Sequence, residues 1–235
     1  MKEDEVLLGW FYDSAGTRQC QTTDKVTSDL TVYASYMSEV MKLTKVGSVV
    51  VDADMMVSGF SSTSYLMSTS DSKLNFVDGL ELVFRAKTTN SSPNQEIFGM
   101  TDADAFEFGA YAGKFMWEIA TGTVSTGTAS CSNNKWYYWK ITKDAGTYNY
   151  HCYYADGTNV TDTPTYIEDK NATRNANING TFAIGIDYWC GSATIHGEPW
   201  LGTIDLKNSY IMVNGKKVKF KIVDSTVSSS LADVK

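Results

Sequence analysis

The fold is decided by residues 197–215, Gly-Glu-Pro-Trp-Leu-Gly-Thr-Ile-Asp-Leu-Lys-Asn-Ser-Tyr-Ile-Met-Val-Asn-Gly. Apolar and polar side chains alternate over short runs in this stretch, which is the pattern of half-buried β-strands. The dipeptide Asn214-Gly215 accommodates the positive φ angles of a two-residue hairpin turn. We therefore predict a strand, a kink, a strand and a turn. The apolar side chains come from Trp200, Ile204, Leu206, Tyr210 and Ile211.

The same period of two extends over most of the chain, with turn residues between the apolar runs. Ser, Thr, Asn and Tyr are plentiful, which suits strands with hydroxyl-rich outer faces better than helices. We expect about a dozen short strands and a two-sheet sandwich, not alternating strands and helices. The runs cover residues 49–51, 55–60, 79–87, 95–100, 105–110, 114–120, 135–143, 147–154, 181–187 and 201–222.

Residues 1–36 predict a small separate β module. Two short strands, over residues 10–12 and 30–36, flank a turn at residues 13–16 and a polar segment.

Residues 37–46 carry apolar side chains at roughly helical spacing, which predicts a short helix or an extended connector. We expect the sandwich to occupy residues 47–224 and a polar tail to follow over residues 225–235.

Two motifs in the predicted sandwich resemble a known family. The hairpin Trp136-Tyr-Tyr-Trp-Lys-Ile-Thr142, with a later Ala155-Asp-Gly157, is the first. The second runs through the closing strands and comprises Gly202, Ile204, Asp205, Leu206, Asn208, Ser209, Tyr210, Ile211, Asn214 and Gly215. Both resemble segments of the concanavalin A-like (laminin G-like) sandwich domains of bacteriophage tail and other virion proteins. The resemblance covers roughly residues 47–224 and implies an all-β, concanavalin A-like jelly-roll β-sandwich, here with a small N-terminal β module.

The N-terminal module carries a resemblance of its own. Gly9-Trp-Phe-Tyr-Asp13 and Thr27-Ser-Asp-Leu-Thr-Val-Tyr-Ala34 are similar to the second half of a Listeria-Bacteroides repeat, a small module of bacterial surface proteins. The first half of that repeat is absent, which favours a chain cut from a longer protein over a degenerate copy.

The charge balance excludes some partners. A net charge of −7 and the lack of a basic patch argue against nucleic-acid binding. Lysines 216, 217, 219 and 221 alternate with apolar residues and predict a solvated strand face. No apolar run approaches the ~20 residues of a membrane span, and the N-terminus lacks the order of a secretory signal. We expect no membrane insertion and a virion or extracellular location without a signal peptide in this chain.

Paired carboxylates are the first chemistry to look for on this fold. Carbohydrate enzymes built on such a sandwich place them at alternating positions of one strand. Here Glu107, Glu118, Glu168 and Glu198 stand apart along the sequence. We therefore expect a chain that is not an enzyme.

A metal site is predicted only weakly. Asp102 and Asp104 place two carboxylates in a predicted loop, and related laminin G-like domains hold calcium at a sandwich rim through such oxygens. Two carboxylates are too few to define a site, and an exposed acidic loop is the alternative. We expect no other cofactor. The four cysteines are widely spaced and are expected to be reduced.

The aromatic residues predict a binding surface. Sugars stack their C–H faces on exposed rings while short polar side chains bind their hydroxyls. Strand alternation turns Tyr137, Trp139 and Ile141 inward and leaves alternate residues of this strand and the next facing outward. The alternative is that the rings belong to the sandwich core. The candidate ligand-binding residues are Tyr138, His151, Tyr153, Asp187, Tyr188 and Trp189.

Four functions are compatible with the sequence. The first is a non-catalytic module of a phage tail fibre or related virion protein that binds a carbohydrate host receptor on the bacterial surface. The second is a structural virion component, such as a capsid decoration or head fibre, packed on other subunits and expected to be a homo-oligomer. A bacterial surface adhesin is a further alternative, and a polysaccharide-active enzyme is the function that the sequence favours least.

Overall fold

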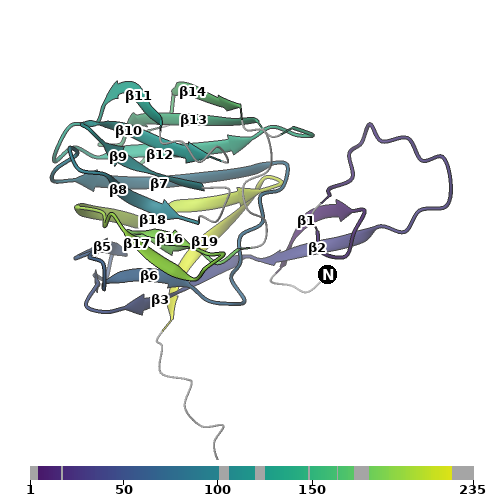
Figure 1. Cartoon of the computed structure of the whole chain (residues 1–235), viewed down its shortest axis with the longest axis horizontal. Coiled ribbons are helices and arrows are strands. Elements are labelled where there is room, and N and C mark those ends of the chain that lie inside the picture. The colour runs from purple at the N-terminus through teal and green to yellow at the C-terminus, as the bar shows by residue number, and fades with distance from the viewer. Residues whose placement is uncertain are drawn as a thin grey trace, which may run out of the picture.

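The chain is an all-β sandwich of the jelly-roll type with a small N-terminal β module, as expected (Figure 1). The computed structural model describes residues 5–16, 18–100, 106–119, 125–147, 149–162, 164–171 and 180–223. Within these ranges every regular element is a strand. None of the described residues forms a helix that is long and apolar enough to cross a membrane.

Seven strands form the first layer of the sandwich. In spatial order they are β11 (Ser125–Ser130), β10 (Lys114–Ile119), β9 (Phe106–Tyr111), β8 (Gln95–Gly99), β15 (Ala183–Ile184), β6 (Tyr65–Ser68) and β3 (Val40–Val46).

The second layer is built around the longest strand of the chain. Its order is β14 (Tyr166–Asn171), β13 (Asn149–Asp156), β12 (Tyr137–Lys143), β7 (Leu80–Thr88) and β18 (Gly202–Val213), with β5 (Met56–Ser58) and β4 (Val50–Val51) beside β18.

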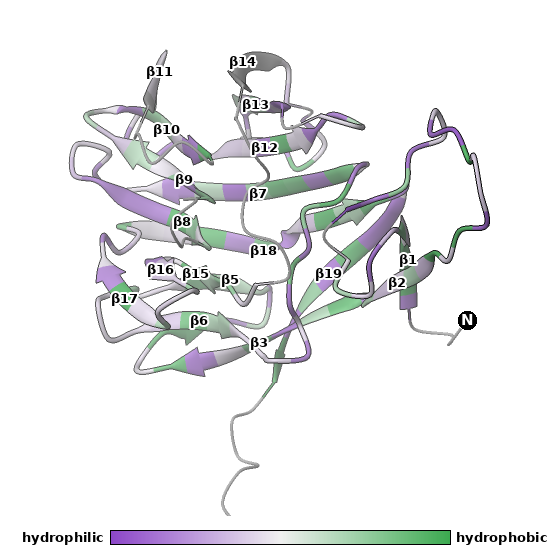
Figure 2. Ribbon diagram, turned by 45° about the vertical axis from the view of Figure 1, so that its right-hand side comes forward, coloured by the Kyte–Doolittle hydropathy of each residue, from purple (hydrophilic) through white to green (hydrophobic). Residues whose placement is uncertain are grey.

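One strand joins the two layers. β19 (Lys216–Val223) pairs antiparallel with β18 on one side and parallel with β3 on the other, so the two layers form one continuous sheet that folds over on itself. Hydrophobic and hydrophilic residues alternate along β19 (Figure 2). Val218 and Phe220 are buried while the lysines are exposed, which confirms the predicted solvated face.

The core lies between the layers and is rich in aromatic rings. Tyr137, Trp139 and Ile141 of β12 face it, as their alternation predicts. Trp139 meets Trp200 edge-on, with ring centroids 5.6 Å apart. None of the four described cysteines forms a disulfide bond, so core packing and the hydrogen bonds of β19 hold the layers together.

The closing stretch has the predicted shape. The kink in β18 is an irregularity between Asp205 and Tyr210, where the register to β7 shifts. The turn into β19 has positive φ angles of 49° at Asn214 and 76° at Gly215, as a tight hairpin between twisted strands requires.

The N-terminal module is one antiparallel pair, β1 (Glu5–Phe11) with β2 (Tyr33–Ser38). It is not separate from the sandwich core, because Val6, Leu8 and Phe11 belong to the same cluster of buried side chains.

Of the two alternatives predicted for residues 37–46, a short helix or an extended connector, the helix is not formed. Residues 40–46 form β3, which is hydrogen-bonded to β19 and β6. Met41 and Leu43 are buried on alternate positions, so the apolar spacing has the period of a strand, which a short run could not distinguish from a helical turn. The polar tail predicted over residues 225–235 lies outside the described residues.

Candidate functional site

A small hairpin covers the outer face of the first layer. It consists of β16 (Asp187–Trp189) and β17 (Thr194–Gly197), which pair antiparallel. The hairpin lies so close to β8 that a Cβ atom on Gly99 would come within 2.7 Å of the Ile186 carbonyl oxygen and the Tyr188 nitrogen. Tyr188, Ile186 and Ala183 form a second buried cluster beneath it. The hairpin is therefore packed on the sheet and does not project as a free loop.

Acidic side chains occupy the part of this outer face next to the hairpin. Glu107 alternates with Phe106 and Phe108, which point into the core, so its carboxylate points outward. Glu118 of β10 is directly opposite Glu107 in the register. Glu96 of β8 shares this face, because it pairs with Gly109, two residues beyond Glu107 in β9.

Two further carboxylates come from the hairpin side. Asp187 begins β16, and Glu198 follows β17. The backbone N–H of Glu96 donates a hydrogen bond to the Glu198 carbonyl oxygen over 2.9 Å, which fixes this segment beside β8. Glu198 has a φ of 57°, an uncommon value for a residue with a side chain. Asn94 Nδ2 donates to Glu198 Oε2 over 2.7 Å and orients the carboxylate.

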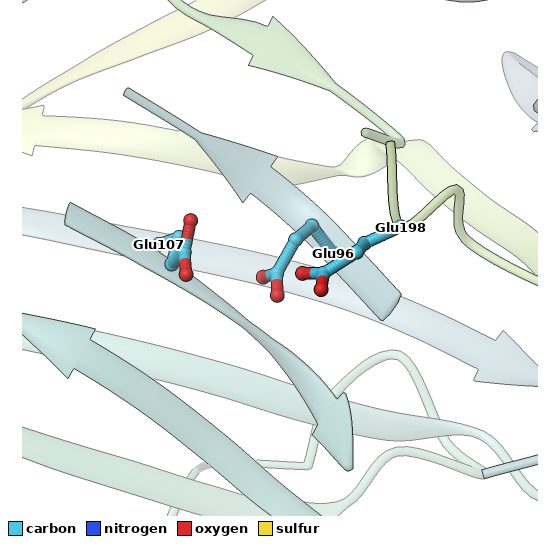
Figure 3. Close-up of side chains that lie close together, drawn as sticks. All are labelled: Glu96, Glu107 and Glu198. Carbon is cyan, nitrogen blue, oxygen red and sulfur yellow. The ribbon is translucent and has the colours of Figure 1, made fainter. Parts of the chain in front are cut away.

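Three of these carboxylates meet at one point. Glu96, Glu107 and Glu198 each place an oxygen within 4.8 Å of the other two (Figure 3). Glu96 is 0% exposed and Glu107 is buried, while Glu198 is half-buried. Neither oxygen of Glu96 has a hydrogen-bond partner, and Oε2 of Glu107 has none.

The electrostatics of the cluster favour neutralisation. Burial, and then the charges of Glu198 and Asp187, raise the pKa of Glu96 well above its ordinary value. Burial, with the charges of Glu96 and Asp187, also raises the pKa of Glu107. The pKa values of Glu118 and Glu198 are raised as well, in both cases mainly by burial. Closely spaced acids of this kind cannot all carry a charge unless a proton or a cation compensates them.

An exposed aromatic pair lies on the same hairpin. The Trp189 ring is 39% exposed and stacks on the His196 ring, with centroids 3.4 Å apart and the planes 10° from parallel. Trp189 Nε1 donates to Asp187 Oδ2 over 3.2 Å, so the indole is also tied to the acidic cluster. We call Trp189 and His196 the ring platform.

The six predicted ligand-binding residues do not form one patch. Tyr138, His151 and Tyr153 lie on the outer side of the second layer, on β12 and β13. The expectation that Tyr138 is exposed is wrong. Tyr138 is 3% exposed and donates its hydroxyl to the Val160 carbonyl oxygen, because the segment after β13 folds over it.

His151 and Tyr153, the other two predicted residues on this face, contact nearby side chains. His151 Nε2 lies 2.9 Å from Asp144 Oδ1, and the Lys140 ammonium lies over the ring of Tyr153 at 5.5 Å. The strand alternation itself is confirmed at Tyr150 and Cys152, which are both in the core.

The structure brings the other three predicted residues to the hairpin. Asp187 joins the acidic cluster, Tyr188 is buried beneath β17, and Trp189 is exposed in the ring platform. Asp102 and Asp104, the predicted calcium ligands, lie outside the described residues.

Three of the four carboxylates that stand apart along the sequence lie close together in the fold. Glu107, Glu118 and Glu198 are distant in sequence but converge in space, together with Glu96, which the sequence did not single out. A signal for part of the cluster was available, because Glu107 and Glu118 each stand between large apolar residues in a predicted strand. A charged residue at such a position must face away from the core.

No protein-family model matches the sequence, and no curated protein matches it. Among solved structures, the chain is similar to domain 4 of AbnA, a GH43 extracellular arabinanase from Geobacillus stearothermophilus, in complex with arabinotriose. The two are 13% identical over 86% of this chain and 91% of that one, with a TM-score of 0.47.

Two animal proteins show a similar shape. One is a heptameric SAP-like pentraxin from Limulus polyphemus, at 14% identity over 59% of this chain and 65% of that chain, with a TM-score of 0.43. The other is the LG4-5 fragment of the mouse laminin alpha1 chain, at 17% identity over 63% of this chain and 39% of that chain, with a TM-score of 0.39. At such values the likeness indicates neither a ligand nor an activity. The resemblances to virion domains and to the Listeria-Bacteroides repeat stay predictions.

Proposed function

We propose that the chain is a non-catalytic carbohydrate-binding module and that its glycan binds at the β16–β17 hairpin. The observation that carries this proposal is the ring platform, in which Trp189 is exposed beside carboxylates. An exposed indole offers an apolar face for the C–H groups of a sugar ring, and it loses little conformational freedom on binding because His196 already stacks on it.

The polar groups near the ring platform suit sugar hydroxyls. Glu198 is half-buried and keeps one carboxylate oxygen that Asn94 does not bind. Asp187 accepts from the Trp189 indole and lies at the base of the platform. Carboxylates accept strong hydrogen bonds from neutral donors, so these groups would fix the orientation of a stacked sugar.

The burial of the acidic cluster supports a binding role without catalysis. A glycosidase needs two carboxyl groups that flank the scissile bond and touch the substrate. Both oxygens of Glu96 are inaccessible to solvent, and Oε2 of Glu107 is as well, so a polymer outside could not reach them. The resemblance of residues 47–224 to virion sandwich domains makes a bacterial surface glycan the expected ligand and a phage tail fibre the expected setting.

The test is a glycan array and a whole-cell binding assay with the full chain and three variants. Trp189→Ala and His196→Ala should lose most binding, because each removes half of the ring platform. Trp10→Ala is the matched control, since Trp10 is 51% exposed on the N-terminal module. Equal binding by the Trp189→Ala and Trp10→Ala variants would reject the site, and no binding by the unmodified chain would reject the function.

A further inference from the structure

We propose that Glu96, Glu107 and Glu198 bind one divalent cation of the calcium type, and that this ion fastens the β16–β17 hairpin to the first layer of the sandwich. These residues come from β8, from β9 and from the segment after β17, so a shared ion would join three parts of the chain. The predicted calcium ligands Asp102 and Asp104 have no part in this proposal.

The spacing of the oxygens suits calcium. Calcium binds oxygen at about 2.3–2.6 Å, so two ligands on opposite sides of the ion lie about 4.6–5.2 Å apart. The three carboxylate oxygens lie within 4.8 Å of one another, so small shifts of the side chains would bring all three to calcium at once. Magnesium, at about 2.1 Å, allows a separation of only about 4.2 Å and also demands octahedral geometry.

The burial of Glu96 is a second, independent reason to expect a bound cation. Its side chain is 0% exposed, its two oxygens have no hydrogen-bond partner, and its carboxylate lies between those of Glu107 and Glu198 (Figure 3). A buried carboxylate without partners is strongly unfavourable. None of the ion pairs among the described residues includes Glu96, Glu107 or Glu198.

Protonation of Glu96 accounts for its unpartnered oxygens less well than a bound cation does. Protonation would remove the charge of Glu96, but a neutral carboxyl group still needs hydrogen-bond partners when it is buried. No such partner is present at either oxygen. A cation would compensate the charge and also coordinate the bare oxygens.

The ion would have a consequence for recognition, and this part rests on the proposed function. Glu198 is two residues from His196, and the backbone of Glu198 is bonded to that of Glu96. An ion that holds Glu198 against Glu96 and Glu107 would therefore fix the ring platform in place. Glycan binding should then weaken when the ion is removed.

The first experiment measures ion binding without any glycan. The full chain is freed of metal with EDTA and dialysed, and CaCl₂ is titrated in by calorimetry while the melting temperature is followed. We expect one ion per chain, a dissociation constant of about 1 mM or tighter, and a higher melting temperature with calcium than with magnesium. No binding, and no change of melting temperature in millimolar calcium, would overturn the proposal.

Variants of the proposed ligands test where the ion binds. Glu96→Gln and Glu107→Gln keep the shape of the side chain but remove a charged ligand, so each should bind calcium at least about tenfold more weakly. Glu81→Gln is the control, because Glu81 lies in the second layer and pairs with Lys140. Calcium binding that survives in both cluster variants would mean that the ion sits elsewhere. Circular dichroism verifies that each variant is folded.

The test of ion binding and the test of glycan binding can fail independently of each other. Trp189→Ala should retain calcium binding, because the indole is not a ligand in this scheme. A chain that binds calcium but no glycan would reject the proposed function and leave the ion site standing. A chain that binds glycan equally with calcium and with EDTA would reject the ion's role in fixing the ring platform.

Discussion

Asp205 shows what the most recognisable motif of the sequence does. Its carboxylate is fully buried and accepts hydrogen bonds from Arg85 Nη1 over 2.6 Å and from the Asn208 side chain over 2.8 Å. The Ser209 hydroxyl donates to the Asp205 carbonyl oxygen. The polar residues of the motif therefore maintain the kink in β18 through hydrogen bonds within the fold.

Removal of Asp205 should destabilise the whole chain. Asp205→Ala would leave the buried guanidinium of Arg85 without its charge partner, which typically costs about 3–5 kcal/mol. The free energy of unfolding in urea measures this loss. Asp54→Ala is the control, because its pair with Lys207 is exposed to solvent and should contribute little to stability. Similar values for the two variants would contradict this account.

Asp78 should give the stability a dependence on acid pH. Burial alone would raise its pKa, but hydrogen bonds from Lys143, Gln21 and the Gly146 backbone outweigh burial, and the pKa is lowered in the folded chain. The unfolded chain then binds the proton first, so this carboxylate stabilises the fold above its unfolded pKa of about 3.9. That stability is lost as the pH falls through the folded pKa.

The comparison with Asp78→Asn isolates this effect. The difference in free energy of unfolding between the two chains should be largest near neutral pH and should shrink below about pH 4. Urea unfolding at pH 7, 5, 4 and 3 measures it. A difference that is constant over this range would show that the charge of Asp78 is not what stabilises the fold.

At the scale of elements, the β16–β17 hairpin depends on the lack of a side chain at Gly99. A methyl group there would press against the hairpin backbone at 2.7 Å, and backbone cannot move aside as a flexible side chain can. Gly99→Ala should cost about 1–3 kcal/mol and weaken glycan binding, as measured by urea unfolding and on the array. Gly180→Ala is the matched control, because its Cβ would meet only the side chains of Met100 and Cys190. Equal losses in both variants would contradict a specific role for Gly99.

Local sequence patterns were sufficient to predict hairpins, in which the two paired strands follow each other along the chain. The β18–β19 hairpin follows from Asn214-Gly215 and from alternation on both sides of it. The pairing of Glu107 with Glu118 could also have been derived, since β9 and β10 are joined by the short turn at Ala112 and Gly113.

The rest of the candidate site was hidden because it depends on long-range packing. An irregularity between Glu96 and Phe98 changes the alternation in β8, so no simple pattern turns Glu96 outward. Glu198 arrives beside it from a distant part of the chain. Tyr138 points away from the core as predicted, but no local pattern indicated that the segment at Val160 would cover it.

At the scale of the whole molecule, the N-terminal module and the sandwich should unfold together. Phe11 of β1 is buried in the same core as the sandwich strands, so Phe11→Ala should cost about 3–5 kcal/mol and lower a single melting transition. Far-ultraviolet and near-ultraviolet circular dichroism should follow the same curve. Two separate transitions would show that residues 5–38 form an independent unit, as the sequence led us to expect.

The parallel pairing of β3 with β19 also determines how the molecule would respond to tension. A pull on the two ends of the chain loads β3 at Val40 and β19 at Val223, in opposite directions along the two strands. The hydrogen bonds between them run across the strands, so they would be sheared and would have to break together. In the β1–β2 pair, Glu5 faces Ser38, so the same pull would open that ladder one bond at a time. The module should therefore unzip at low force, while the sandwich beyond it acts as a mechanical clamp.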